Sequence, residues 1–239
     1  MQLTELSLAC EQFYGLKKPA FSLTPDTEFY VDLPSQKAAF DILVYALSGG
    51  EGFIKISGEV GTGKTLLCRR LLNRLSEQQI PTAYIPNPDL TPSALWRVIA
   101  RELQIDDQPL PDSQVQYCVQ QALLTMAADG KTLVLLIDEA QCMPRDTMEA
   151  LRLISNLETE RQKLIQIVLF GQPELDTLLQ NISLRQLRQR ITYSARLEPL
   201  NNSESLSVYL QQRLSAAGYR GMPLFQPGAL KALWRASQG

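Results

Sequence analysis

The feature that most constrains the fold is a glycine-rich stretch, residues 58–65, with the sequence Gly-Glu-Val-Gly-Thr-Gly-Lys-Thr. It matches the G-x-x-x-x-G-K-[ST] pattern of a P-loop at every fixed position. Residues 53–57 before it are typical of a short buried strand, and leucines recur at helical spacing after residue 65. This order of strand, glycine loop and helix favours a phosphate-binding loop over an ordinary glycine turn that happens to precede Lys-Thr.

The residue types of the loop indicate its chemistry. Its glycines allow positive φ and a close approach of the backbone to phosphate oxygens. Consecutive N–H groups and the positive end of the following helix dipole then attract the anion. Lys64 is expected to reach the β- and γ-phosphates, and the Thr65 hydroxyl is expected to bind Mg²⁺. The predicted nucleotide-binding residues are Gly58, Glu59, Val60, Gly61, Thr62, Gly63, Lys64, Thr65 and Leu66.

A second stretch carries the other half of the predicted chemistry. Residues 133–137 are a continuous aliphatic run, typical of a central parallel strand buried on both faces. Asp138 follows at the C-terminal end, where a Walker B carboxylate holds Mg²⁺ directly or through water. Glu139 comes next and is placed to orient or deprotonate the attacking water. The alternative is a solvated acidic pair at a strand end.

The remaining patterns predict an α/β P-loop NTPase fold with a five-stranded parallel sheet flanked by helices. Predicted strands cover residues 53–57, 82–85, 133–137, 164–170 and 191–197. Predicted helices cover residues 35–47, 66–75, 92–103, 113–128, 146–157, 205–216 and 228–236.

Three parts of the chain are expected. Residues 1–34, rich in aromatic residues and proline, are predicted to pack near the nucleotide, with packing against the sheet edge as the alternative. Residues 35–200 are predicted to be the ATPase core. Residues 201–239 are expected to form a partial, truncated helical lid.

Two further groups of residues are candidates for the site. Gln172 follows a predicted strand and would lie beside the γ-phosphate, because ligands gather at the C-terminal ends of parallel strands. It could instead be a polar helix-start residue without function. Arg185, Arg188 and Arg190 lie close together before the fifth strand. They are either a solvated basic face or contain an arginine finger for a neighbouring subunit.

Composition excludes several classes of chemistry. The chain has no histidine, so histidine acid–base catalysis and histidine metal sites are excluded. Its four cysteines are widely spaced, without a C-x-x-C pair, so neither zinc nor a disulfide framework is indicated. The net charge of −2 gives no global basic field for nucleic acid. No signal peptide or membrane-spanning run is recognised, so a cytoplasmic location is expected.

Taken together, the motifs resemble a known family. The P-loop, residues 137–141 (IDEAQ), residues 171–175 (GQPEL) and residues 187–191 (LRQRI) are similar to those of AAA+ ATPases of the ExeA/GspA type, the general secretion pathway protein A family. The likeness covers nearly the whole chain. It implies that the P-loop and Asp138-Glu139 are Walker A and Walker B.

The resemblance also implies roles for three other residues. Gln172 takes the sensor-1 position, and Arg190 best matches the arginine of the finger box. Asn87, at the end of the second strand, corresponds to a polar glutamate switch that holds Glu139 away from water. The family's lid continues with a sensor-2 arginine segment, which would begin where this chain ends at Gly239, so lid closure is an open question.

The function implied by the resemblance is Mg²⁺-dependent ATP hydrolysis that drives or regulates assembly of a bacterial type II secretion or MSHA/type IV-like pilus machine. The expected partners are ATP or ADP, further copies of the chain in a ring, and secretion or pilus proteins, at the cytoplasmic face of the inner membrane or in the cytoplasm. The short pilus-biogenesis form is favoured, because the chain has no transmembrane or peptidoglycan-binding part. The alternatives are an ATP-controlled DNA-binding switch of the transposition-ATPase kind and a signalling ATPase with little turnover.

Overall fold

The computed structural model describes residues 11–22, 26–159 and 162–239. The chain divides into two compact units. The core unit contains residues 37–197, and the terminal unit contains residues 1–36 together with 198–239. The expectations for residues 1–10 and 23–25 lie outside the described residues. No helix in the described part of the chain is long and apolar enough to cross a membrane.

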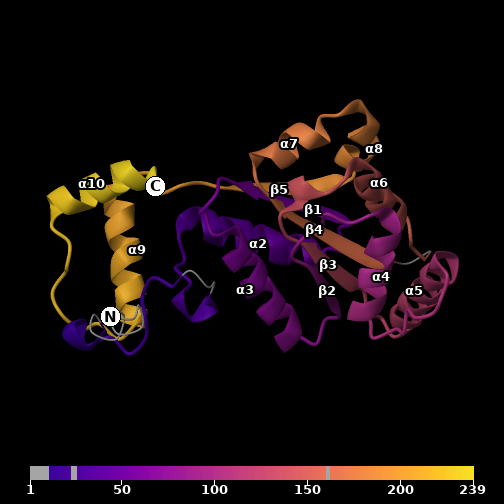
Figure 1. The fold of residues 1–239 in the computed structure, drawn as a ribbon, viewed down its shortest axis with the longest axis horizontal. Coiled ribbons are helices and arrows are strands. Elements are labelled where there is room, and N and C mark those ends of the chain that lie inside the picture. Colours follow the sequence, from indigo (N-terminus) through magenta and orange to yellow (C-terminus); the bar gives the residue numbers. More distant parts are fainter. Residues whose placement is uncertain (1–10, 23–25, 160–161) are drawn as a thin grey trace. The chain divides into compact units, whose positions relative to one another are not determined.

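The core unit is built on one parallel sheet, with strand order β2-β3-β4-β1-β5 (Figure 1). Every strand pairing in it is parallel, so the predicted five-stranded parallel sheet is confirmed. The strands are β1 (Phe53–Gly58), β2 (Thr82–Ile85), β3 (Leu133–Ile137), β4 (Ile165–Gly171) and β5 (Ile191–Leu197). Because β1, β4 and β3 are neighbours in the middle of the sheet, the segments that follow them meet at one edge.

Helices cover both faces of this sheet. Figure 1 shows α2 and α3 on one side, and α4, α5 and α6 on the other. The bounds are α2 (Pro34–Ser48), α3 (Lys64–Glu77), α4 (Pro92–Glu102), α5 (Asp112–Ala128), α6 (Arg145–Ile154), α7 (Pro173–Leu179) and α8 (Arg185–Gln189), with 3₁₀ turns η1 (Thr27–Phe29), η2 (Ala140–Cys142) and η3 (Ile182–Leu184). The alternating strand and helix order is that of an α/β fold.

Each predicted helix is present, but some begin or end at other residues than predicted. The helix expected to reach residue 157 ends at Ile154, where the Ser155 hydroxyl donates to the Arg152 carbonyl at 2.7 Å. Two short helices, α7 and α8, were not predicted. With seven and five residues, they contain too few turns to produce a clear periodic pattern.

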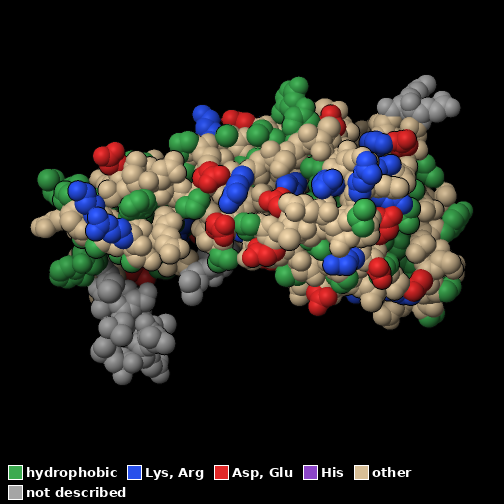
Figure 2. Space-filling model, turned by 90° about the horizontal axis from the view of Figure 1, so that it is seen from above, with side chains coloured by type: hydrophobic (Ala, Val, Ile, Leu, Met, Phe, Trp, Pro, Cys, Tyr) green, Lys and Arg blue, Asp and Glu red, His purple; other side chains and the backbone are tan. Residues whose placement is uncertain are grey.

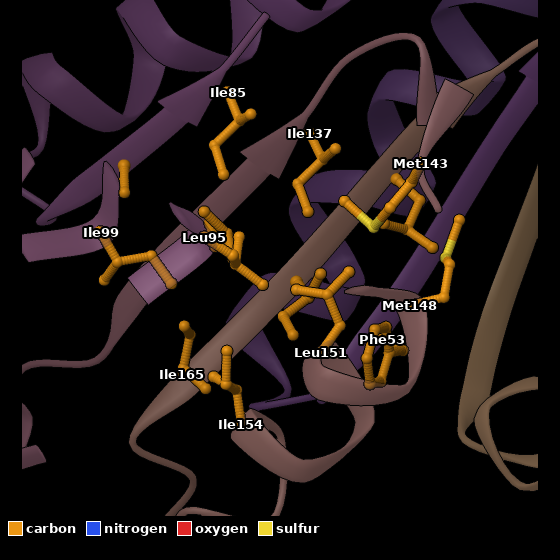
Figure 3. Packing of buried hydrophobic residues seen from close by; sticks show 14 of the residues in the cluster. Phe53, Ile85, Leu95, Ile99, Ile137, Met143, Met148, Leu151, Ile154 and Ile165 are labelled. Carbon is orange, nitrogen blue, oxygen red and sulfur yellow. The ribbon is translucent and has the colours of Figure 1, made fainter. Parts of the chain in front are cut away.

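The main hydrophobic core lies between one face of the sheet and helices α4 to α8 (Figure 3). Phe53, Ile137 and Ile165 point into it from the strands, and Leu95 and Leu151 point into it from α4 and α6. The residues between these on the strands, such as Ile54 and Leu136, are also fully buried, so the other face of the sheet is covered too. A sheet buried on both faces explains why its central strands are continuous apolar runs.

The terminal unit has its own, smaller cluster of buried residues. It contains α9 (Ser203–Ala216) and α10 (Pro227–Ser237), which agree with the two helices predicted after residue 201. Ala20, Phe29, Leu214 and Ala217 form the buried cluster. The described part of the N-terminal segment therefore packs against α9. Its predicted position near the nucleotide depends on how the two units are arranged and stays a prediction.

A single arginine fixes much of that packing. Arg213 on α9 is 9% exposed, and its guanidinium donates to the carbonyls of Ala20 at 2.9 Å and Phe29 at 3.2 Å. The same group lies over the Phe29 ring, 5.1 Å from its centroid. The Lys17 N–H adds a bond to the Ala217 carbonyl at 2.7 Å. Fixed guanidinium geometry thus joins segments far apart in the sequence.

Candidate nucleotide-binding and hydrolysis site

The P-loop connects β1 to the N-terminus of α3, as predicted. Gly61 and Gly63 have φ of 82° and 88°, a conformation that glycine adopts without strain. Gly58 is needed for a different reason, because an added Cβ would lie 2.7 Å from Thr62 Oγ1 and 2.9 Å from the Leu197 carbonyl oxygen. The Thr62 hydroxyl donates to the Glu59 carbonyl at 2.8 Å. These contacts give a tight loop at the start of a 14-residue helix, where an anion is favoured.

Lys64 lies inside this loop. It is 6% exposed, and its Nζ donates to the carbonyls of Gly58 and Glu59, each at 2.8 Å. Burial lowers the pKa of Lys64, and the nearby carboxylates of Glu139 and Asp138 act in the opposite direction. The ammonium is therefore held by the loop it belongs to, where it can neutralise a bound phosphate.

Thr65 and Asp138 meet across the edge of the sheet. Asp138 is 2% exposed, and its N–H donates to the Ile85 carbonyl at 2.9 Å, which continues the β3–β2 pairing. Burial raises the pKa of Asp138, while a hydrogen bond from the Thr65 side chain opposes that shift. The structure thus brings together the two predicted Mg²⁺ ligands.

The donor set suits magnesium better than a metal that needs an all-protein cage. No group of three or more His, Cys, Asp or Glu side chains that could hold a metal occurs among the described residues. Mg²⁺ is commonly bound by one or two protein oxygens, substrate phosphates and several waters. A hydroxyl and a carboxylate beside a phosphate-binding loop fit that pattern.

Glu139 follows directly and has an unusual backbone. Its φ of 49° and ψ of 38° place it in the left-handed region, which costs a residue with a side chain about 1 kcal/mol. Its N–H donates to Asp138 Oδ1 at 3.0 Å. Backbone strain of this kind is often found at functional sites. Here it accompanies a turn that places two consecutive carboxylates at the same edge of the sheet.

Two amide side chains hold the Glu139 carboxylate. Gln172 Nε2 donates to Glu139 Oε2 at 3.0 Å, and Gln141 Nε2 donates to the same oxygen at 2.5 Å. Gln172 follows β4, so the structure places it beside the predicted catalytic carboxylate. Gln141 is the last residue of the IDEAQ motif at residues 137–141, but no role was predicted for it. A single glutamine carries no pattern from which such a contact could have been predicted.

Asn87 does not make the expected contact. Its side chain is exposed, and its Oδ1 accepts from the Asp89 N–H at 3.4 Å. No hydrogen bond joins it to Glu139 among those found for the described residues. The reason is local: β2 ends at Ile85, and Asn87 lies in the loop beyond Pro86, where a short asparagine side chain bonds its own backbone. In this structure the carboxylate is held by glutamines instead, and a switch role for Asn87 stays a prediction.

The three arginines of the candidate finger group are exposed. Arg185 begins α8, Arg188 lies in its last turn, and Arg190 follows it as the C-terminal cap. Arg190 Nη1 donates to the Ser155 hydroxyl at 3.0 Å. Arg190 therefore has a partner within its own chain, and its role towards a neighbouring subunit stays a prediction.

Comparison with known proteins gives a family match and a relative. The family model described as an AAA domain matches residues 47–179. General secretion pathway protein A of Aeromonas hydrophila is 42% identical over 233 residues, covering 95% of this chain and 41% of the relative. The chain thus spans about two fifths of that relative's length.

Solved structures share the fold at low identity. Cdc6p from Pyrobaculum aerophilum has a TM-score of 0.62 at 18% identity, covering 87% of this chain and 57% of that one. The ORC1 protein of Aeropyrum pernix in complex with DNA has a TM-score of 0.60 at 19% identity, with 94% and 59% covered. The ORC2 protein of the same organism, in ADPNP–ADP complexes, has a TM-score of 0.59 at 19% identity, with 81% and 56% covered. These likenesses show the fold alone.

Proposed function

Because the chain belongs to the AAA ATPases of the general secretion pathway protein A (ExeA/GspA) type, we propose that it binds ATP with Mg²⁺ and hydrolyses it at the P-loop site. One observation carries this proposal: the Glu139 carboxylate is fixed by hydrogen bonds next to the Thr65–Asp138 pair. A module that only binds nucleotide does not require that carboxylate.

Each residue of the site has a distinct task in this proposal. Lys64 donates to the β- and γ-phosphates, whose other oxygens accept from the N–H groups of the loop. Thr65 and Asp138 would hold Mg²⁺, which supplies charge neutralisation at the phosphates. Glu139 orients the attacking water and accepts its proton, and Gln172 is close enough to help orient the same water or the γ-phosphate. Since the chain has no histidine, a carboxylate is the expected general base.

The cellular role is proposed from the relative. We infer that hydrolysis drives or regulates assembly of a type II secretion or MSHA/type IV-like pilus machine, since the relative is named for the general secretion pathway. The chain would act as a homo-oligomer in which Arg190 completes a neighbour's site. In this arrangement residues 35–200 form the ATPase core, and residues 201–239 form a helical lid.

The DNA-switch alternative gains no support from surface charge. The net charge is −2, and acidic side chains lie among the basic ones on the face shown in Figure 2. The likeness to the DNA-bound ORC1 structure concerns the fold only. Salt-dependent retention of the protein on immobilised DNA would favour that alternative.

Two substitutions test the proposal. Glu139→Gln keeps the shape of the side chain but cannot accept a proton, so ATP should bind and remain unhydrolysed. Lys64→Ala should instead weaken nucleotide binding, by about 10- to 100-fold for a lost charge-assisted contact. Fluorescent-nucleotide titration and phosphate release measure the two effects separately.

The controls are chosen within the chain. Lys131→Ala removes an exposed lysine that precedes β3, at the opposite edge of the sheet from the P-loop, and should change neither quantity. Parental turnover by the Glu139→Gln variant would exclude Glu139 as the general base. Parental affinity in a folded Lys64→Ala variant would refute the phosphate-binding role of the loop.

A further inference from the structure

The Gln141 side chain bridges the two loops of the site. Its Nε2 donates to Glu139 Oε2 at 2.5 Å, and its Oε1 accepts from the Gln172 N–H at 3.0 Å. One amide group thus uses its donor on the segment after β3 and its acceptor on the segment after β4. The two contacts fix the orientation of the amide, because turning it over would place an N–H against the Gln172 N–H.

The neighbouring backbone leaves room for this bridge. Gly171 ends β4, and a Cβ added there would lie 3.1 Å from Gln141 Oε1 and 2.8 Å from Leu175 Cδ2. Any side chain at residue 171 would therefore press on the oxygen that accepts from Gln172. The glycine before Gln172 has a packing reason that the sequence pattern alone did not give.

The bond from Gln141 determines how the Glu139 carboxylate is oriented. Both amide donors described for Glu139 are on Oε2, which leaves Oε1 to accept from a water. If Gln172 turns towards the γ-phosphate or the attacking water, it gives up its bond to Glu139. Gln141 is then the donor that keeps the carboxylate oriented. The amide also limits the rotation of a side chain attached to a strained backbone at φ 49°.

We propose that Gln141 is a positioning residue for the reaction: it holds the Glu139 carboxylate in the orientation that receives the proton and couples it to the segment carrying Gln172. This inference rests on the proposed ATP hydrolysis. Gln141 acts through its bonds to Glu139 and to the Gln172 N–H, so its loss should lower kcat and leave nucleotide binding nearly unchanged.

Two variants of Gln141 separate two roles: orienting the Glu139 carboxylate, and only stabilising the Gln172 segment through the bond to its N–H. Gln141→Met keeps the length of the side chain and removes both hydrogen bonds. Gln141→Glu keeps an acceptor for the Gln172 N–H, but it loses the donor and places a carboxylate beside Glu139. For positioning, we expect kcat to fall about 10- to 100-fold in Gln141→Met, with KM and ADP affinity within about threefold of the parent. Gln141→Glu should lose at least as much kcat.

If Gln141 only stabilises the Gln172 segment, the kcat values of the two variants should fall in the opposite order. In that case Gln141→Glu would recover activity relative to Gln141→Met, and the proposal would be overturned. Parental kcat in Gln141→Met would overturn it as well. Cys142→Ala is the matched control at the next residue. Cys142 is exposed, its N–H bond to the Glu139 carbonyl is kept in the variant, and its Sγ lies at a long 3.7 Å from Gln141 Nε2. It should leave kcat unchanged.

A second measurement does not depend on turnover. Urea unfolding of Gln141→Met, Glu139→Ala and the double variant forms a double-mutant cycle. Non-additive changes in the free energy of unfolding support the direct hold of Gln141 on Glu139, and additive changes overturn it. If the parent releases no phosphate, the proposed function fails, and the cycle still decides whether Gln141 holds the carboxylate.

Discussion

Different kinds of internal contact stabilise the core unit and the terminal unit. In the core unit, a continuous apolar cluster joins the sheet to five helices, and side chains bond one another at the site. In the described part of the terminal unit, four buried residues form the cluster, and Arg213 bonds to main-chain carbonyls. A large core can carry strained and desolvated catalytic groups, whereas a small one depends on a few specific bonds.

The largest expected effect belongs to the core unit and leaves its fold intact. If Arg190 is the finger of the proposed oligomer, Arg190→Ala should reduce phosphate release by ~10³–10⁵ while nucleotide affinity stays at the parental value. Ser155→Ala is the control, because it removes the in-chain partner of Arg190 without changing the guanidinium. Arg188→Ala and Arg185→Ala test the other two candidates.

Mixing experiments show whether the finger acts in trans. A Lys64→Ala subunit cannot use ATP but can supply Arg190, and an Arg190→Ala subunit has the reverse defect. Mixtures should therefore regain measurable phosphate release. If light scattering shows mixed oligomers and every mixture remains inactive, Arg190 does not act across the interface.

The same substitution in the two units compares their packing directly. Leu135 on β3 is 0% exposed within the large cluster, and Leu214 on α9 is 6% exposed within the small one. Leu135→Ala should lower the free energy of unfolding by about 3–5 kcal/mol, and Leu214→Ala by about 2 kcal/mol or less. Urea unfolding monitored by circular dichroism measures both. Equal losses would contradict the contrast between a large and a small core.

The terminal unit should respond most to loss of its arginine. Arg213→Lys keeps the positive charge but cannot donate to two carbonyls in fixed directions, so the bond to Ala20 or Phe29 is lost, at about 1–3 kcal/mol for an unsatisfied buried group. Hydrogen exchange of residues 12–22 should accelerate, with exchange in β3 and β4 unchanged. Arg220→Lys is the control, since exposed Arg220 bonds only the Ser215 hydroxyl among the described residues.

Local patterns were predicted in both units, and long-range contacts were predicted in neither. The P-loop, the five strands and the Asp138–Glu139 pair were predicted because each is a local pattern of about ten residues or fewer. The Gln141–Gln172 bond joins residues 31 positions apart, and the Arg213–Ala20 bond joins residues 193 positions apart. Neither bond produces a periodic pattern in the sequence, so neither could be predicted without the structure. No hydrogen bond between Asn87 and Glu139 is found among the described residues, because loop side chains follow local backbone geometry that strand patterns do not specify.

The smallest expected effect is a difference in acid sensitivity between two segments that are held by arginines. In the core unit an arginine is bound by a carboxylate, and in the terminal unit Arg213 is bound by main-chain carbonyls. Two arginines of α4 donate to the loop before α5 and to the start of that helix. Arg101 donates to the Asp107 carboxylate at 3.0 Å, and Arg97 donates to the Asp107 carbonyl at 2.9 Å and to Asp112 at 2.6 Å. The bond from Arg101 lowers the pKa of Asp107.

A carboxyl whose pKa is depressed by folding contributes stability above its unfolded pKa of about 4 and loses it as the pH falls through the folded value. Hydrogen exchange of residues 104–111, corrected for intrinsic rates, should therefore accelerate below about pH 4, and Asp107→Asn should remove most of that dependence. Exchange at residues 12–22 should change less, because the carbonyls that accept from Arg213 do not titrate. Equal acid sensitivity of the two segments would show that the choice of acceptor does not set their response to pH.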